Sequence, residues 1–207
     1  ASVQIQGQHT NIVNVTKNGE TLISQNENQK NEPLIINKEL LNVKEIIEFA
    51  DVVNVDEIED ILSRQINFNY KIAEEGIKNH YGIEVGRTLK KYFQWDDVRV
   101  RAKALAAAGS DARMGGSTLP VVINSGSGNQ GLTVSIPVIE FAKDLGVSNE
   151  ILYRSLVVAN LIAIHQKTDI GNLSAFCGAV TAATGAACGL TYLHGGRFEE
   201  ISQTIIN

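Results

Sequence analysis

The chain has 207 residues, of which 43% are hydrophobic and 20% charged, with a net charge of −5 at pH 7. This composition is typical of a soluble globular protein that buries a core without disulfide or metal crosslinks. The negative charge argues against nucleic-acid binding, and no apolar run is long enough to cross a membrane. With two cysteines and no visible signal peptide, we expect a cytoplasmic protein.

The first part of the chain has the pattern of β-strands. Residues 2–24 alternate apolar and polar side chains, and Asn18-Gly19 is a strong signal for a hairpin turn. We therefore expect two or three antiparallel strands, followed by a polar loop at 25–33.

From Asn37 onward, the spacing of apolar residues becomes that of helices, with Asn37 as the expected N-cap of the first one. Further helices are expected near 55–80, 84–108, 132–145, 148–167, 172–194 and 197–207. The sequence therefore predicts an α+β fold, with a β segment and loop at 1–36 and a mainly α-helical body at 37–207. Because the chain lacks an initial methionine and stops within an apolar period, we expect it to be a portion of a longer protein.

The segment "NSGSGNQG" at 124–131 places Gly126, Gly128 and Gly131 in the pattern G-x-G-x-x-G. A dinucleotide site also needs a strand before the motif and a second parallel strand after the helix. A helical pattern follows Gly146 instead, which disfavours that interpretation. A structural turn and a small-anion pocket remain equally open, because hydroxyls, amides and bare backbone beside a helix start offer many hydrogen-bond donors.

Two further segments carry charged residues near this turn. Asp111 and Arg113 lie between an alanine-rich helix and a glycine turn, where they would orient a substrate or cap the helix. The segment "RVRAK" at 99–103 is expected on the solvent face of a helix.

Cys177 and Cys188 lie in a segment rich in small residues. On one continuous helix they would share a face but stand about 16 Å apart, too far for a disulfide or for one small metal cluster. The residues alone favour the interpretation that both cysteines are small, buried hydrophobic side chains.

Three segments, "AGSDARMGGSTLPVVINSGSGNQG", "LSAFCGAVTAATGAACG" and "YLHGG", together resemble the L-cysteine desulfidase family. Its catalytic part is related to the α domain of iron–sulfur L-serine dehydratases, and the resemblance runs from about His9 to the last helix. It implies a lyase that uses no pyridoxal phosphate and carries a [4Fe–4S] cluster acting as a Lewis acid. The implied reaction converts L-cysteine to pyruvate, ammonia and sulfide, or L-serine to pyruvate and ammonia.

The resemblance implies that Cys177 is one ligand of this cluster and that Cys188 is not. The other family ligands belong to motifs that this sequence lacks, so we expect the cluster in the full-length protein and not in this chain alone. Candidates for the base are Lys167 and His9. The resemblance and the hydrogen-bonding chemistry of the glycine-rich turn together give the expected substrate-binding residues, which are Asn124, Ser125, Ser127, Gly128, Asn129, Gln130, Asp111 and Arg113.

The expected partner is a small amino acid, with no nucleic acid and no membrane, and a homo-oligomer is compatible with the sequence. No residue decides between a thiol and a hydroxyl substrate. Two alternatives remain open: an amino-acid-binding module without a cluster and, less favoured, a dinucleotide-dependent oxidoreductase. A parallel sheet ahead of Gly126 would support the latter.

Overall fold

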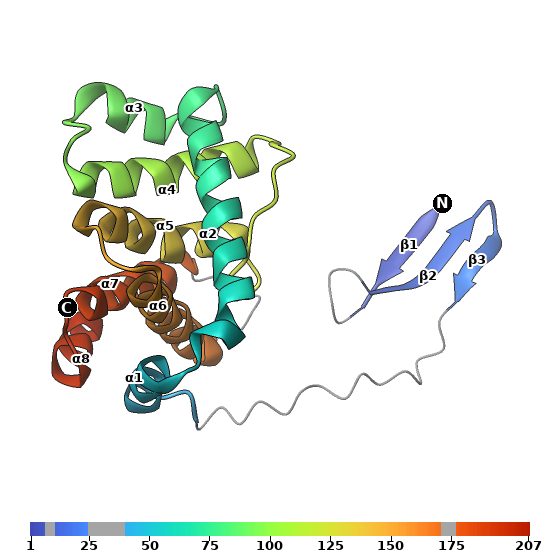
Figure 1. Cartoon of the computed structure of the whole chain (residues 1–207). Helices are drawn as coiled ribbons and strands as arrows, with labels where there is room; N and C mark the ends of the chain where they lie inside the picture. Colours follow the sequence, from blue (N-terminus) through green and yellow to red (C-terminus); the bar gives the residue numbers. More distant parts are fainter. Residues whose placement is uncertain (7–10, 25–39, 171–176) are drawn as a thin grey trace. The chain divides into compact units, whose positions relative to one another are not determined.

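The computed structural model describes residues 1–6, 11–24, 40–170 and 177–207. The chain divides into two compact units, Ala1–Asn37 and Lys38–Asn207. A small antiparallel sheet forms the first unit and helices form the second, which is the predicted α+β class (Figure 1). Two expected positions, the base candidate His9 and the N-cap Asn37, lie outside the described residues.

The sheet has three strands in the order β1 (Ser2–Ile5), β2 (Ile12–Lys17) and β3 (Glu20–Ser24), and both pairs are antiparallel. Asn18 and Gly19 join β2 to β3 with φ angles of 54° and 86°. Two successive positive φ angles define a type I′ turn, whose twist matches that of the two strands it joins. The predicted hairpin is thereby confirmed.

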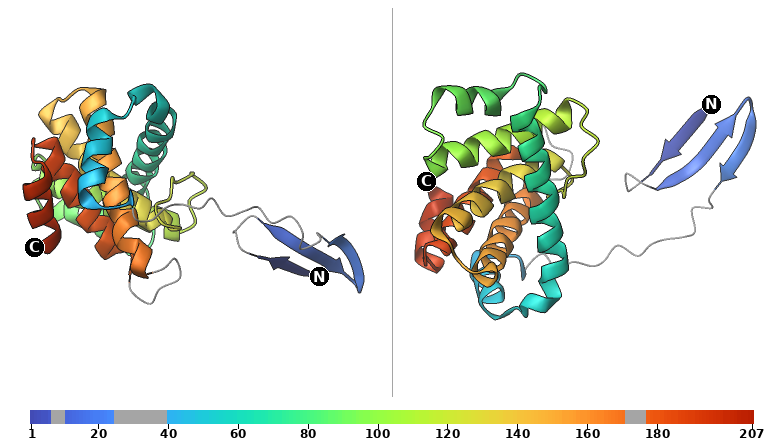
Figure 2. Two further views of the ribbon diagram at one scale, coloured as in Figure 1. Left: turned by 90° about the horizontal axis from the view of Figure 1, so that it is seen from below. Right: turned by 45° about the horizontal axis from the view of Figure 1, so that its top comes forward.

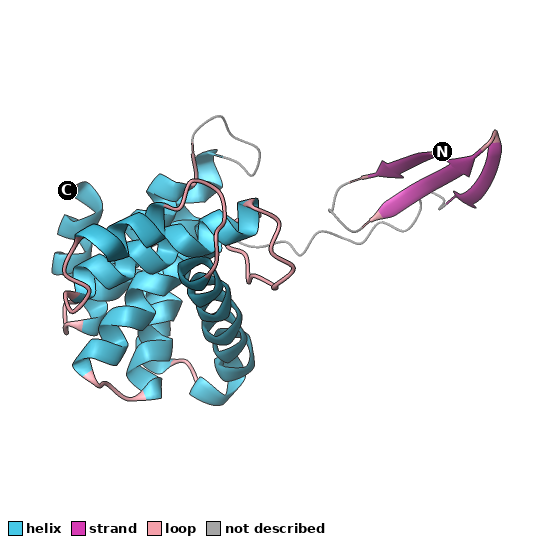
Figure 3. Ribbon diagram, turned by 90° about the horizontal axis from the view of Figure 1, so that it is seen from above, coloured by secondary structure: helices cyan, strands magenta, loops and turns pink. Residues whose placement is uncertain are grey.

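The larger unit consists of helices joined by loops, as Figures 2 and 3 show from several directions. The helices are α1 (Val43–Val52), α2 (Val55–Lys78), α3 (Val85–Tyr92), α4 (Val98–Met114), α5 (Gly128–Leu145), α6 (Asn149–Ile170), α7 (Ala179–Leu193) and α8 (Phe198–Ile206). No helix among the described residues has both the length and the apolar character needed to cross a membrane.

Helix α5 is the centre of this unit, since it packs against α2, α4, α6 and α7. Most of its apolar side chains are buried, including Leu132, Val134, Ile136 and Ile139, each of which is 0% exposed. Burying a side chain of this size contributes about 1.5–3 kcal/mol. The core therefore holds α5 in a fixed place, and the loop before it, residues 115–127, is positioned with it.

Some element boundaries differ from the sequence-based expectation. The single helix expected at 84–108 is two helices, because Asp97 caps a new helix by accepting a hydrogen bond from the Arg99 N–H (2.8 Å). The first helix begins at Val43, with Asn42 as its N-cap, rather than at Asn37. In both cases a local side-chain cap decides the boundary, which an apolar pattern alone does not reveal.

Candidate functional site

The segment "NSGSGNQG" forms a tight turn that leads directly into α5. The Asn124 and Ser127 backbones exchange two N–H···O=C hydrogen bonds, each 3.1 Å long. Between them, Ser125 and Gly126 have φ angles of 49° and 84°, so this is also a type I′ turn. The Ser125 hydroxyl donates to Asn124 Oδ1 at 2.9 Å, which helps to hold a conformation that non-glycine residues seldom adopt.

This turn is not the phosphate loop of a dinucleotide-binding protein. Residues 117–123 ahead of it form no strand, and helix α6, not a strand, follows Gly146. Within the described ranges there is accordingly no parallel sheet at this motif, which that class of site requires.

Buried amides hold the turn against α6. The Asn124 side-chain N–H₂ group donates to the Asn160 carbonyl (3.3 Å) and to Asn160 Oδ1 (3.0 Å). Asn160 and Gln65 of α2 exchange two amide hydrogen bonds of 3.0 and 2.9 Å. Asn124 and Gln65 are only 4% and 3% exposed, so this network fixes the turn in the interior of the fold.

A second buried amide, Asn69 of α2, fixes the segments on both sides of the turn. Its Oδ1 accepts the Val122 N–H at 2.8 Å. Its N–H₂ group lies within hydrogen-bonding distance of the Val122 carbonyl, the Gly131 carbonyl and Ser135 Oγ, at 3.0–3.2 Å. Sequence reasoning missed Asn69, Gln65 and Asn160. A usable signal was the placement of two amides four residues apart on the apolar face of an amphipathic helix.

The start of α5 presents unpaired backbone donors. Ser127 is the N-cap, but its side chain makes no capping hydrogen bond. The first bond of the helix runs from the Gly131 N–H to the Ser127 carbonyl. In the part of the chain that is described, the N–H groups of residues 128–130 have no acceptor. Such groups, together with the positive end of the helix dipole, favour a carboxylate or another small anion.

Arg113 lies directly beside this helix start. A Cβ atom added to Gly128 would stand 2.4 Å from Arg113 Nε, so glycine is required for the guanidinium to approach the backbone. Arg113 also donates to Asn129 Oδ1 at 3.2 Å. The structure thus brings together Arg113, Gly128 and Asn129, which the sequence placed in one site.

Gln130 connects this helix start to α7. Its side chain lies against Gly178, where an added Cβ would be 2.1 Å from Gln130 Cδ. Gln130 is 8% exposed, and its Oε1 atom is buried with no hydrogen-bond partner among the described residues. A buried carbonyl oxygen without a donor is rare in folded proteins, and a water, an ion or a bound ligand completes such a position. Cys177 is the next residue before Gly178, and it is exposed.

Two other candidates lie in different surroundings. Asp111 Oδ2 accepts the Val85 N–H at 2.8 Å, so its carboxylate caps the start of α3. Lys167 is 4% exposed on α6, two helical turns beyond Asn160 and therefore on the same side of that helix. Across the described ranges, neither a hydrogen bond nor an ion pair to the Lys167 ammonium is present.

The two cysteines differ sharply in environment. The expectation that both are buried is wrong for Cys177, which precedes α7 and is exposed, and right for Cys188, which is 0% exposed. Burial raises the pKa of the Cys188 thiol to about 12, so it stays protonated and is a poor metal ligand. The described residues contain no group of three His, Cys, Asp or Glu side chains that could hold a metal ion. With one accessible thiol, they do not by themselves fit a [4Fe–4S] cluster, which is held mainly by cysteine thiolates.

Comparison with known proteins shows the family of the chain. The family model of the serine dehydratase alpha chain matches residues 12–207. A UPF0597 protein of Lachnoclostridium phytofermentans is 52% identical over 205 residues, which are 99% of this chain and 49% of that protein. UPF0597 proteins of Desulfitobacterium hafniense and Treponema denticola are 50% and 48% identical, and the matches cover 99% and 97% of this chain and 47% and 48% of those proteins. The chain thus spans about half the length of these relatives, and no solved structure is detectably similar. With nearly its whole length matched, the chain belongs to the serine dehydratase alpha chain family.

Proposed function

We propose that this chain forms the amino-acid-binding part of a β-eliminating lyase that uses no pyridoxal phosphate and acts on L-cysteine or L-serine. The observation that carries the proposal is the meeting of two helix starts. The first turn of α5 holds the unpaired N–H groups and Gln130, whose side chain lies against Gly178, the residue that follows the exposed Cys177. Membership of the serine dehydratase alpha chain family supports lyase chemistry at this place.

In this proposal, the carboxylate and the amino group of the substrate each have a partner of matching chemistry. The substrate carboxylate binds the N–H groups at 128–130, with the Arg113 guanidinium adding positive charge beside them. The substrate amino group donates to Gln130 Oε1, the acceptor that lacks a partner in the described chain. Ser125 and Ser127 contribute hydroxyls from the turn.

The elimination then needs a base for the α-proton and a path for the leaving group. Lys167 is the candidate base, because its amine is buried on the side of α6 that holds the turn; it accepts the proton only in its neutral form. The electrons of the C–H bond form the Cα–Cβ double bond as the C–S or C–O bond breaks, and sulfide or hydroxide departs with the bonding pair. The resulting 2-aminoacrylate takes up water to give pyruvate and ammonia.

A [4Fe–4S] cluster belongs to this proposal for the full-length protein. Cys177 is the residue of this chain that would bind it, because Cys188 is buried and protonated. The further thiolate ligands would have to come from outside these 207 residues, since the sequence contains only two cysteines.

The test is a pyruvate assay with L-cysteine and L-serine, using full-length protein reconstituted with iron and sulfide without oxygen. Gln130→Met keeps the side-chain length but removes the acceptor oxygen, and we expect KM to rise at least about tenfold, the size of one charge-assisted hydrogen bond. Gln203→Met, the same exchange at an exposed position on α8, is the matched control and should leave KM unchanged. Absence of pyruvate from both substrates at stoichiometric iron would refute the lyase. Retained amino-acid binding in that preparation would favour a binding module.

A further inference from the structure

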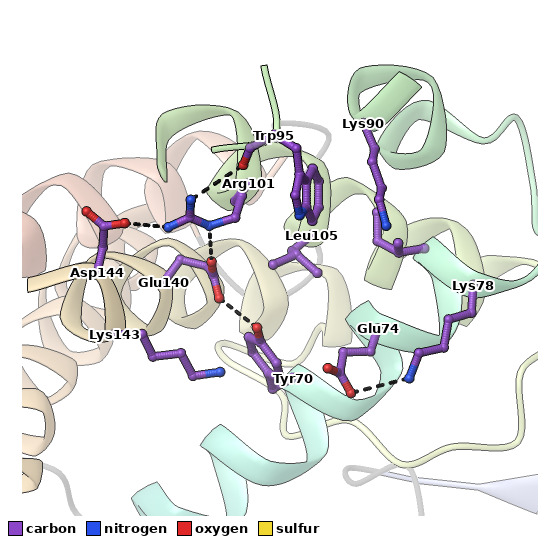
Figure 4. A pocket seen from close by; sticks show the side chains of 11 residues that line it. Tyr70, Glu74, Lys78, Lys90, Trp95, Arg101, Leu105, Glu140, Lys143 and Asp144 are labelled. Atoms are coloured by element: carbon purple, nitrogen blue, oxygen red, sulfur yellow. Dashed lines mark hydrogen bonds and ion pairs between the residues drawn. The ribbon is translucent and has the colours of Figure 1, made fainter. Parts of the chain in front are cut away.

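A second hollow lies toward the other end of α5, between α2, α3, α4 and α5, and has a volume of about 520 Å³ (Figure 4). A buried carboxylate, that of Glu140, stands in its wall with 4% of its side chain exposed. One oxygen of Glu140 accepts the Tyr70 hydroxyl at 2.8 Å, and the other accepts Arg101 Nε at 3.1 Å. Both oxygens therefore have a donor, and the carboxylate is held in place.

Arg101 makes this wall rigid. Besides Glu140, its guanidinium pairs with Asp144 at 2.5 Å and donates to the backbone carbonyls of Asp96 (2.8 Å) and Trp95 (3.4 Å). These contacts tie the turn before α4 to α5, and they place the Trp95 ring beside the hollow. The hydrogen bond to Asp144, and then the one to Glu140, raises the pKa of Arg101, so its charge is permanent.

Two of the lysines that line the hollow, Lys90 and Lys143, each lie against an aromatic ring. The Lys143 ammonium lies 3.0 Å from the centre of the Tyr70 ring, and the Lys90 ammonium lies 4.8 Å from that of Trp95. Neither forms an ion pair with any residue in the described ranges, whereas Glu140 and Asp144 pair with Arg101. Partial burial lowers the pKa of Lys143, and the nearby charges of Glu140 and Glu74 act in the opposite direction.

The lining of the hollow has a surplus of one positive charge, because four cations, Lys78, Lys90, Arg101 and Lys143, face three acids, Glu74, Glu140 and Asp144. Glu74 pairs with Lys78 at 3.7 Å. Figure 4 shows Lys90 and Lys143 on opposite sides of the hollow, with Leu105 and the ring of Trp95 between them. A protein with a net charge of −5 therefore has at this place a hollow of slight positive charge, with the half-buried ring of Trp95 between two lysines.

We propose that this hollow binds a small organic anion, whose carboxylate or phosphate group pairs with Lys90 or Lys143 and whose apolar body contacts Trp95. The ammonium groups match the charge of the anion, and its apolar part covers the face of the half-buried Trp95 ring that borders the hollow. The volume lies within the range of about 300–1,000 Å³ that is usual for small-molecule sites. This hollow is separate from the site proposed at the start of α5. Binding of an anion to it is measured without enzyme turnover, so the result does not depend on the proposed lyase activity.

Trp95 gives a direct readout, because it is the only tryptophan in the sequence. The 207-residue chain is titrated with phenyl phosphate, phenylacetate and the neutral benzyl alcohol, following Trp95 fluorescence and, independently, heat by calorimetry. We expect saturable binding of at least one anion and none of benzyl alcohol. Comparison of the two anions tells whether the ligand group is a phosphate or a carboxylate.

The variants Lys90→Gln and Lys143→Gln should each weaken binding of that anion about tenfold, as expected for loss of a charge-assisted contact. Lys103→Gln, an exposed lysine of α4 that does not line the hollow, is the matched control and should bind like the unmodified chain. Circular dichroism checks that all variants are folded. Failure of both anions to bind in calorimetry, or equal affinity in the Lys90→Gln/Lys143→Gln double variant, overturns the proposal.

Discussion

At the scale of single residues, buried amides decide the shape of the candidate site. Asn69 is 0% exposed and bridges the segment before the turn and the first turn of α5. Because both its oxygen and its nitrogen are used, no apolar residue can replace it without leaving buried backbone groups unpaired.

Asn69→Leu should therefore destabilise the chain by about 2–4 kcal/mol, since it leaves the Val122 N–H and the carbonyls around it without partners in the interior. The free energy of unfolding in urea measures this effect. Asn67→Leu makes the same exchange at an exposed position of the same helix and should change stability by less than about 0.5 kcal/mol. Equal losses in the two variants would show that Asn69 does not have this bridging role.

The cysteines give a second prediction at this scale. Burial raises the pKa of Cys188 from 9.0 to about 12, while Cys177 is exposed. We expect a thiol reagent to label Cys177 alone in the folded chain at pH 8, and both cysteines after unfolding. Labelling of Cys188 at the rate of Cys177 would contradict its burial.

The same shift predicts a pH dependence of stability. Since the folded-state pKa of Cys188 is raised, its contribution is complete below pH 9 and is lost as the pH rises from 9 toward 12. The free energy of unfolding should thus fall more steeply across this window in the unmodified chain than in Cys188→Ala.

At the scale of elements, the close approach of α6 and α7 depends on glycine. A Cβ added to Gly185 would stand 2.4 Å from the Ala159 carbonyl oxygen, and one added to Gly189 would stand 2.8 Å from the Ala159 Cβ. This packing brings the start of α7, with Cys177 and Gly178, to the helix that also holds the turn through Asn160.

The apolar spacing of the sequence predicted most of the helices and strands. The expectation that 99–103 lies on a solvent face does not hold for Arg101, which pairs with Glu140 and Asp144.

Gly185→Ala should destabilise the larger unit by about 1–3 kcal/mol, because the new methyl group meets a backbone carbonyl that cannot move aside. This outweighs the gain of about 1 kcal/mol that alanine brings to a helix interior. Thermal unfolding followed by circular dichroism measures the change. Ala183→Val, which adds bulk on the exposed face of α7, is the control and should cost less than about 1 kcal/mol. A Gly185→Ala chain as stable as the unmodified one would mean that the helices are not packed this closely.

At the scale of the whole molecule, the core belongs to the larger unit. The buried apolar cluster of the described residues runs from Ile46 to Ile201, and the partly buried side chains packed on it run from Leu41 to Ile205. Residues 38–207 should therefore fold without 1–37. We expect this shortened chain to keep its helical circular dichroism spectrum and a single cooperative thermal transition. A broad, non-cooperative melt would show that the first unit is needed for folding.

The sequence by itself determined the features that arise from local interactions. The Asn18-Gly19 hairpin, the helical body and the start of a helix after the glycine-rich turn follow from backbone preferences and apolar spacing over a few residues. The same holds for family membership, because the matched segments are continuous in sequence.

Only the tertiary structure decided which of these segments meet. Gln65, Asn124 and Asn160 form one network although they come from three distant parts of the chain. Gln130 reaches Gly178 because α5 and α7 pack side by side, and Cys177 is exposed while Cys188 is buried because helix α7 begins between them. Local preferences are silent on such contacts, since they depend on how helices far apart in sequence bury their apolar faces against one another.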